Sequence, residues 1–410
     1  MMATPMESGY GRPHPAHNPA LTEVGPGTPV GELMRRYWQP VGLSGELGEL
    51  PTPVRVLGED LVLFRDGRGR PGLLAAHCCH RGTSLEYGRV EREGVRCCYH
   101  GWLFDVDGRC LEMPCEPAES TYKDKVRQPW YPCREYGGLV FAYMGPLAKM
   151  PVFPRYDLAE EGDGVIIPDG TSYGLGGGTV IACNWLQIYE NVMDPFHVAV
   201  LHSTFSGGQF SSAMNLRPDV SWELTDHGVS STQVREMPDG RVFRRVTEIL
   251  LPNIRIVPSV GAGDGDGFER AGHIGWIVPI DDTHTRMYSL LRVPVRDGQP
   301  MFPPRARHNG KLWAELTEDE RHRMPGDKEA IESQGPIAIH ANERLATTDR
   351  GVIMTRKMLK GAIDAVASGA DPAGILRDPD RDMITTIAGN TIAARTTFDG
   401  ACDVKVQKRS

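Results

Sequence analysis

Two short segments rich in cysteine and histidine constrain this chain more than any other feature. The first is Cys78-Cys79-His80 and the second is Cys97-Cys98-Tyr99-His100. Together they offer two thiolates and two imidazoles, which is the ligand set of a [2Fe–2S] cluster in which two histidines bind one of the irons. Neutral imidazoles bring no negative charge to the cluster, so its reduction potential is higher than with four thiolates. The two segments therefore predict a site that passes single electrons.

Each segment holds two adjacent cysteines, so the ligands must be chosen between them. A Cys-x-His spacing in the first segment and a Cys-x-x-His spacing in the second favour the first cysteine of each pair. Cys79 and Cys98 occupy the intervening positions, and we expect their side chains to point away from the cluster. The predicted cluster ligands are Cys78, His80, Cys97 and His100.

The surroundings of the two segments agree with tight turns. Gly82 and Gly101 follow the ligands, and a residue without a side chain lets backbone N–H groups approach the sulfurs. Zinc uses the same ligand types, but its ligand pairs are usually two like residues, as Cys-x2–4-Cys or His-x3–5-His. Neither segment has such a pair, which disfavours a zinc site.

His197 and His202 form a second candidate metal site. They are five residues apart, and on a regular α-helix this separates their directions by about 140°. One metal ion could still bind both if the helix widens locally to an i→i+5 turn, a distortion often found at functional sites. Two histidines and one carboxylate are typical of non-haem Fe(II) centres that leave positions open for O2. Beside the first site, we favour this interpretation over two satisfied core histidines.

These motifs together resemble the Rieske non-haem iron ring-hydroxylating oxygenases, and among them the phthalate type that has α subunits only. The resemblance runs from about residue 20 to about residue 370. It implies an α+β fold, with an N-terminal all-β Rieske [2Fe–2S] domain and a C-terminal helix-grip catalytic domain that has an antiparallel sheet and a mononuclear iron. The similar segments are Leu21 to Pro29, Arg35 to Val41, Cys78 to Gly82, Gly88 to Glu91, Arg96 to Asp105 and Glu190 to His202.

The resemblance also implies the remaining site residues. Asp327 falls at the position of the third iron ligand, whereas Glu329 and Glu332 are alternatives that we expect on a solvated helix face. Asp194 matches an aspartate that joins an iron-ligating histidine to a cluster-ligating histidine of the neighbouring subunit. Asp194 and Asn191, from the Glu-Asn-x-x-Asp motif, are the expected catalytic residues. The implied iron ligands are His197, His202 and Asp327.

Apolar runs and turn residues divide the chain into three parts. Residues 1–39 indicate an N-terminal tail with a helix at 30–38, residues 40–150 an all-β domain, and residues 151–410 the catalytic domain. The proline-rich stretch from Met150 to Pro154 is the expected joint. The expected strands are 54–57, 61–64, 72–74, 139–143, 165–167, 220–229, 241–251, 254–257 and 286–293, and a long helix is expected over 349–369.

Composition excludes several other classes of function. A chain of 410 residues with a net charge of −8 has no basic patch for nucleic acid. No apolar run approaches the roughly 18 residues that a membrane span needs. The five cysteines outside the two Cys/His segments are scattered and no secretory signal precedes them, so we expect free thiols and a cytoplasmic location.

The electron donor is expected to be a separate protein. Gly174 to Gly178 lacks the full G-x-G-x-x-G spacing of a dinucleotide site, and Gly261 to Gly267 indicates an acidic loop. The resemblance implies an NADH-oxidising iron–sulfur flavoprotein reductase as the partner. It also implies a homotrimer or homohexamer, because head-to-tail packing brings the cluster of one subunit close to the iron of the next.

These inferences predict a terminal oxygenase that uses O2 and Fe(II) in the catabolism of aromatic compounds. Cis-dihydroxylation of an aromatic carboxylate, such as a phthalate isomer or a substituted benzoate, is the favoured reaction. Monooxygenation or O- or N-demethylation of a substituted arene is the alternative. A pure Rieske electron carrier is disfavoured by the second iron motif. The substrate contacts stay open among Arg217, Arg235, Arg245 and Arg255.

Overall fold

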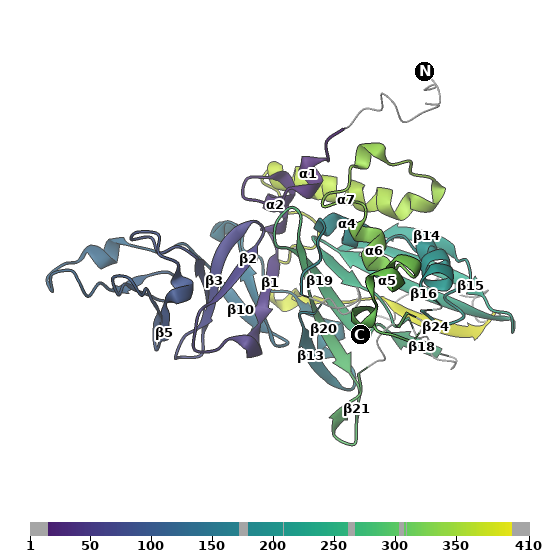
Figure 1. Cartoon of the computed structure of the whole chain (residues 1–410), viewed down its shortest axis with the longest axis horizontal. Coiled ribbons are helices and arrows are strands. Elements are labelled where there is room, and N and C mark those ends of the chain that lie inside the picture. The colour runs from purple at the N-terminus through teal and green to yellow at the C-terminus, as the bar shows by residue number, and fades with distance from the viewer. Residues whose placement is uncertain are drawn as a thin grey trace.

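The computed structural model describes residues 15–171, 179–207, 209–260, 267–302, 307–308 and 310–395. Within them, a smaller β-rich part at one end of the long axis adjoins a larger part built around one extended sheet (Figure 1). The glycine stretch 174–178 and most of the 261–267 loop lie outside the described residues.

The smaller part consists of three antiparallel sheets. Its strands are Trp38–Leu43 (β1), Thr52–Val56 (β2), Glu59–Arg65 (β3), Pro71–Ala75 (β4), Arg89–Glu91 (β5), Gly94–Arg96 (β6), Leu103–Phe104 (β7), Cys110–Glu112 (β8), Trp130–Tyr131 (β9), Cys133–Tyr136 (β10) and Leu139–Tyr143 (β11). The sheets have the orders β1-β11-β10, β2-β3-β4-β9 and β5-β6-β7-β8. The two Cys/His segments lie in the connections that follow β4 and β6, so neighbouring loops present both.

The expected strands in this part correspond to β2, β3, β4 and β11. The helix expected over 30–38 is wrong at its end. Helix α2 covers Pro29–Met34, and Trp38 already begins β1, where it pairs with Tyr143. Trp38 is 6% exposed, so burial of its large side chain against the sheet outweighs the helical pattern of the residues before it.

The larger part is an antiparallel nine-stranded sheet with helices packed against it. The main path of the sheet runs β13-β20-β19-β17-β16-β15-β14, and β24 pairs with both β16 and β18. Its strands are Val165–Asp169 (β13), Asp219–Leu224 (β14), Gly228–Glu236 (β15), Arg241–Leu250 (β16), Ile254–Ile256 (β17), Gly267–Arg270 (β18), His273–Pro279 (β19), Thr285–Val293 (β20) and Gly389–Ala394 (β24). Short pairs are formed by Arg155–Tyr156 (β12) with Met383–Ile384 (β23) and by Val295–Arg296 (β21) with Gln299–Pro300 (β22).

The helices are short except for one. They are Pro19–Thr22 (α1), α2, Asp157–Glu160 (α3), Trp185–Asn191 (α4), a π-helix at Val198–Phe205, Glu318–Arg323 (α5), Asp327–Glu332 (α6) and Arg350–Ala367 (α7). In Figure 1, α7 lies along one edge of the molecule with α2 and α4 beneath it. The long helix expected over 349–369 corresponds to α7, which buries Val352 and Leu359. Grouped strands covered by helices form the predicted α+β class.

One predicted strand of the larger part is wrong. The residues 220–229 form the end of β14, a turn at 225–227 and the start of β15, because Thr225 turns the chain. Its hydroxyl accepts a hydrogen bond from the N–H of Gly228 at 2.9 Å. Strands β19 and β24 were not expected, although both pair along much of their length within the sheet.

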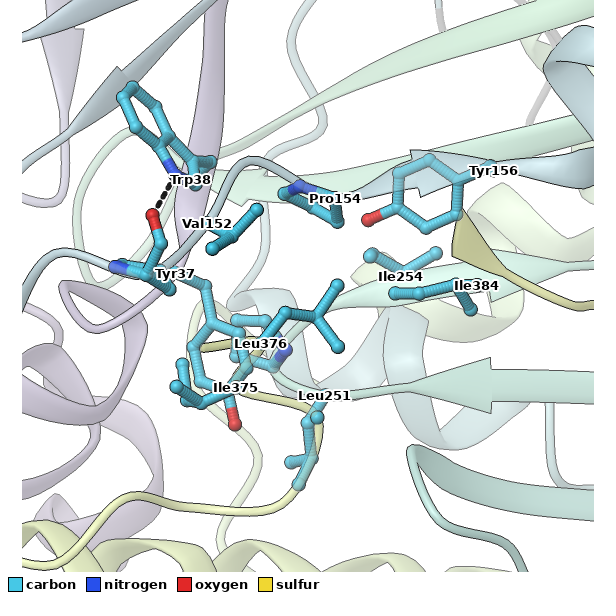
Figure 2. Close-up of a pocket in the computed structure, with 13 residues that line it drawn as sticks. Tyr37, Trp38, Val152, Pro154, Tyr156, Leu251, Ile254, Ile375, Leu376 and Ile384 are labelled. Atoms are coloured by element: carbon cyan, nitrogen blue, oxygen red, sulfur yellow. Dashed lines mark hydrogen bonds between the residues drawn. The ribbon is translucent and has the colours of Figure 1, made fainter. Parts of the chain in front are cut away.

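The proline-rich joint is packed tightly against both parts. Figure 2 shows Val152 beside Trp38 and Pro154 beside Tyr156, with Leu376 below them near Tyr37. The indole N–H of Trp38 donates to the carbonyl oxygen of Pro151 at 3.3 Å. The space left between these side chains is about 20 Å³, which is room for about one water molecule.

No helix among the described residues has the length and apolar character required to span a bilayer.

Candidate metal centres and active-site cavity

Burial distinguishes the two cysteines of each Cys/His segment. Cys78 and Cys97 are 2% and 3% exposed and belong to the hydrophobic cluster of the smaller part, whereas Cys79 and Cys98 are exposed. Burial, together with the neighbouring Cys97, raises the pKa of Cys78 to about 12. Two buried, neighbouring cysteines are what a shared cluster requires, so their burial favours the register that the spacing predicts.

The glycines of the two loops act differently from what we expected. Gly82 and Gly101 both have φ of +75°, a conformation that favours glycine. Their N–H groups donate to the carbonyl oxygens of Cys78 at 2.8 Å and Cys97 at 3.1 Å rather than to sulfur. Each loop is thus closed by the same backbone turn, which sets the position of the cysteine.

The two histidines lie on the outer side of this site. The ring centroids of His80 and His100 are 4.5 Å apart, and the His80 ring stacks on Trp102 at 4.3 Å with an angle of 8° between the planes. His80 is exposed. Two inner thiols and two outer imidazoles fit a [2Fe–2S] cluster whose histidine-bound iron faces the surface.

The second centre is built on α4 and the π-helix. Asn184 caps α4, since its side-chain oxygen accepts a hydrogen bond from the N–H of Leu186 at 3.1 Å. The π-helix begins directly after His197 and includes His202, so the predicted widening of the helix is confirmed. It brings the two rings to a centroid distance of 5.4 Å.

Asp327, the first residue of α6, faces both histidines. Its Oδ1 is 3.4 Å from Nε2 of His197 and 3.2 Å from Nε2 of His202. Burial opposes ionisation of Asp327, but the two histidines hold the pKa of its carboxyl well below the usual range. Burial would lower the pKa of His197, but Asp194 and Asp327 raise it to about 10. These three side chains, of which His202 is buried and the other two are half-buried, could hold a metal ion, since their ligand atoms lie within 4.8 Å of one another.

The two expected catalytic residues border this triad. Oδ2 of Asp194 is 3.6 Å from Nδ1 of His197, the ring nitrogen that faces away from Asp327. The side-chain amide of Asn191 donates to Oδ1 of Asp327 at 3.4 Å. The side chain of Asp194 is 34% exposed and therefore accessible to a neighbouring molecule.

Gln209 is a functional residue that the sequence analysis missed. Its Oε1 lies 2.5 Å from Nδ1 of His202, and its amide nitrogen lies 3.3 Å from Nε2 of His308. If Nε2 of His202 binds metal, Nδ1 carries the proton and donates to Gln209. The seven-residue separation between Gln209 and His202 gives no periodic signal in the sequence, and His308 comes from a distant segment.

The carboxylates that competed with Asp327 are engaged elsewhere. Glu329 accepts from the indole N–H of Trp313 at 2.6 Å, and Glu332 pairs with Lys328 at 2.7 Å. Another group of potential ligands comprises Glu190, His340 and Glu343. There, Arg356 donates to both carboxylates at 2.6 to 3.0 Å, so a cationic side chain already occupies the site, which disfavours a metal.

A cavity of about 810 Å³ opens beside the triad. Its lining includes His197, His202 and Asp327 together with residues of the sheet. Of the four candidate arginines, Arg245 and Arg255 line it. The carbons of Val198, Phe210, Met214, Val257, Leu291 and Val293 make much of the remaining wall apolar. Such a mixed pocket suits an apolar ligand with a few polar groups.

Comparison with known proteins agrees with both centres. Residues 37–129 match the Rieske [2Fe-2S] domain, and residues 181–365 match the vanillate O-demethylase oxygenase C-terminal domain. The phenoxybenzoate dioxygenase subunit alpha of Ectopseudomonas oleovorans is 46% identical over 397 residues, which cover 95% of each chain. The chain belongs to the Rieske non-haem iron oxygenases.

Other similar proteins show the breadth of this family. The oxygenase subunit of tert-butanol monooxygenase / tert-amyl alcohol desaturase from Aquincola tertiaricarbonis is 40% identical, covering 92% of this chain and 81% of the relative. Among solved structures, NdmB from Pseudomonas putida CBB5 superposes with a TM-score of 0.63 at 20% identity, over 92% of this chain and all of that one. The latter likeness concerns the fold alone.

Family membership confirms several predictions. The chain is an oxygenase, and hence an oxidoreductase, rather than a pure electron carrier. It uses a Rieske [2Fe–2S] cluster and a mononuclear iron, and it works with O2 and a reductase partner.

Proposed function

We propose that this chain is the terminal oxygenase of a multicomponent system that dihydroxylates an aromatic carboxylate, using O2 and electrons from a reductase. The main support is the cavity that joins a His197–His202–Asp327 triad to a wall with buried arginines. The relative that is 46% identical carries the name phenoxybenzoate dioxygenase, which points to the same substrate class.

We assign the cluster to Cys78, His80, Cys97 and His100, and the mononuclear Fe(II) to His197, His202 and Asp327. Fe(II) held by two histidines and one carboxylate keeps positions open at which O2 and substrate chemistry take place. The protein's part is to orient these ligands and to exclude water. Gln209 lies within hydrogen-bonding distance of the His202 ring, and Asp194 lies 3.6 Å from Nδ1 of His197, close enough to attract its N–H.

We further propose that the electron donor is an NADH-dependent iron–sulfur flavoprotein reductase, that the chain forms a homotrimer or homohexamer, and that it is located in the cytoplasm. Asp194, 34% exposed beside His197, supports contact with a neighbouring subunit.

The alternative is monooxygenation or oxidative demethylation of a substituted arene. It is favoured by the match of residues 181–365 to the vanillate O-demethylase oxygenase C-terminal domain. Both reactions would use the same triad, so the product decides between them.

The test is a turnover assay of the holoenzyme with a phthalate-type reductase, NADH and O2 on a panel of aromatic acids and methoxyarenes. Product analysis must accompany NADH consumption, because O2 can be reduced without substrate oxidation. We expect a cis-diol or its breakdown product from an aromatic acid. An Asp327→Ala control should keep a reducible cluster but form no product. Formation of a phenol and an aldehyde instead would establish the alternative, and full activity of Asp327→Ala would contradict the iron assignment.

A further inference from the structure

Three adjacent strands each place one basic side chain on the wall of the cavity that also contains the triad. Arg245 of β16, Arg255 of β17 and His273 of β19 all line the cavity, and these strands are neighbours in the sheet. Thr247 and Val257, two residues further along β16 and beyond the end of β17, line it as well. Residues two apart share one face of a strand, so this face is directed into the cavity.

Arg255 is buried without a counterion. It is 9% exposed, its Nε is buried without a hydrogen-bond partner, and it forms no ion pair in the part of the chain that the structure describes. A buried cation without an anionic partner is costly. A protein retains such a buried cation where a bound ligand supplies the missing negative charge.

The neighbouring strand is shaped to hold this side chain. Arg255 pairs with Gly275 across β17 and β19. A Cβ at Gly275 would lie 3.3 Å from Nε and 3.4 Å from Cγ of Arg255, closer than side chains normally pack. The absence of a side chain at Gly275 therefore leaves the space in which the arginine stem lies.

Arg245 adds a second charge that is also not neutralised. Its guanidinium donates to three uncharged acceptors, the carbonyl oxygens of Ser259 at 2.7 Å and Pro258 at 2.8 Å and Oδ1 of Asn390 at 3.0 Å. Burial lowers the pKa of Arg245 to about 9 and that of Arg255 to about 10, so both stay protonated at neutral pH.

The remaining charged groups do not cancel this pair. Burial and the two arginines lower the pKa of His273 to about 3, so it is neutral. The charge of Asp327 raises the pKa of Arg255, but this carboxylate faces the two histidines. The charge of Glu269 raises the pKa of Arg245, but Glu269 is exposed. Glu161 and Asp163 also line the cavity, but among the described residues neither they nor any other carboxylate forms an ion pair with Arg245 or Arg255.

The other arginines near the cavity have clearer partners. Arg270 pairs with Asp157, and Arg292 donates to the carbonyl oxygens of Leu158 and Gly162, although one of its amino groups is unpartnered. Arg235 does not line the cavity and donates to Leu216 and Gln233. Arg217 is exposed and lies outside the cavity wall.

We propose that Arg255, supported by Arg245, binds the carboxylate of the substrate and so restricts this oxygenase to anionic arenes. The inference rests on the proposed function. A planar guanidinium matches a carboxylate with two parallel hydrogen bonds, and inside an apolar wall such charged hydrogen bonds are strong. A neutral arene would leave the buried charge unpaired, so the site selects against it.

The test measures anaerobic binding of phenoxybenzoate and of its uncharged carboxamide to the iron-loaded protein, with iron and cluster content verified. Wild type should bind the carboxylate more tightly. Arg255→Gln should raise the Kd of the carboxylate about tenfold or more and change that of the carboxamide less than about twofold. Gly275→Ala keeps the charge but crowds Arg255, so it should weaken carboxylate binding less than Arg255→Gln does. Arg255→Lys also keeps a positive charge and should bind the carboxylate more tightly than Arg255→Gln.

Two arginines serve as controls. Arg286→Gln removes a charge from the same sheet outside the cavity wall and should leave both Kd values unchanged. If Arg292→Gln loses the carboxylate preference and Arg255→Gln keeps it, the anchor is Arg292 and the proposal is wrong. Equal binding of carboxylate and carboxamide by wild type would also overturn it. A carboxylate preference that depends on Arg255, but with no product on turnover, would support the anchor and contradict the proposed function.

Discussion

Single side chains outside the triad decide how its histidines are oriented. His197 faces a carboxylate, Asp194, whereas His202 faces a neutral amide, Gln209. A carboxylate increases the basicity of a ligating imidazole more than an amide does. The two histidines should therefore differ in how firmly they hold iron, and the hydrogen bond to Gln209 is the main restraint on the His202 ring.

We predict that Gln209→Leu weakens binding of the mononuclear iron by about 10- to 100-fold, because the His202 ring loses its acceptor. Gln209→Glu should retain the iron, since a carboxylate accepts the same hydrogen bond. The measurement is the rate of iron loss to a chelator, with the cluster absorbance as an internal reference. Gln233→Leu, another glutamine of the cavity wall, is the control. Equal iron retention in Gln209→Leu and wild type would show that Gln209 does not act on His202.

The buried and exposed cysteines give a second test at this scale. Cys97→Ser should lose the visible Rieske spectrum, because a buried sulfur beside Cys78 is removed. Cys98→Ser should keep it, since Cys98 is exposed. Absorption and electron paramagnetic resonance spectra of the two purified variants are to be compared. If only Cys98→Ser lost the Rieske spectrum, Cys98 rather than Cys97 would be the cluster ligand.

At the scale of elements, one glutamine ties together the two helices that carry the iron site. Gln187 of α4 is 4% exposed. Its amide donates to the carbonyl oxygens of Ile331 and Gly335 at 3.0 Å, and its Oε1 accepts from the N–H of Ala338 at 3.0 Å. These bonds fix α6, and with it Asp327, relative to α4.

Gln187→Leu should therefore lower the free energy of unfolding by about 3 kcal/mol, because three buried backbone groups lose their partner. We also expect weaker iron binding, since α6 is released at its C-terminal end. Thermal unfolding and iron content are the measurements. Gln334→Leu, at an exposed position in the same segment, should change neither. A stable Gln187→Leu variant with full iron would mean that α6 is held by its other contacts.

The sequence predicts those elements whose chemistry requires a fixed local spacing. The Cys/His loops and the widened helix between His197 and His202 follow from ligand geometry alone. The family resemblance led to Asp327, which composition and periodicity do not distinguish from Glu329. Strand β19 and the pairing of Gly275 with Arg255 could not be predicted, because they depend on contacts between distant segments. For the same reason, the four candidate arginines could be separated only by their partners in the structure.

The whole molecule places its two redox centres in different parts of one chain. In Figure 1, β5 of the smaller part lies toward one end of the long axis, while α6, which carries Asp327, lies in the larger part. His80 and His100 form the outer side of their loops, and Asp194 is accessible beside the triad. A head-to-tail interface that closes into a ring would join these surfaces on neighbouring subunits.

In such a ring, Asp194 accepts one hydrogen bond from Nδ1 of His197 and a second from His100 of the next subunit. Asp194→Asn keeps the size of the side chain but removes its charge and one acceptor oxygen. We therefore expect both metal centres to persist while electron transfer from cluster to iron, measured in a single turnover, slows by about 10- to 100-fold. Asp163→Asn, another acidic residue of the cavity wall, should transfer electrons normally. Sedimentation should show a trimer or hexamer for wild type and for both variants. A fully active monomer, or undiminished transfer in Asp194→Asn, would contradict the ring, because electrons would then reach the iron without a neighbouring cluster.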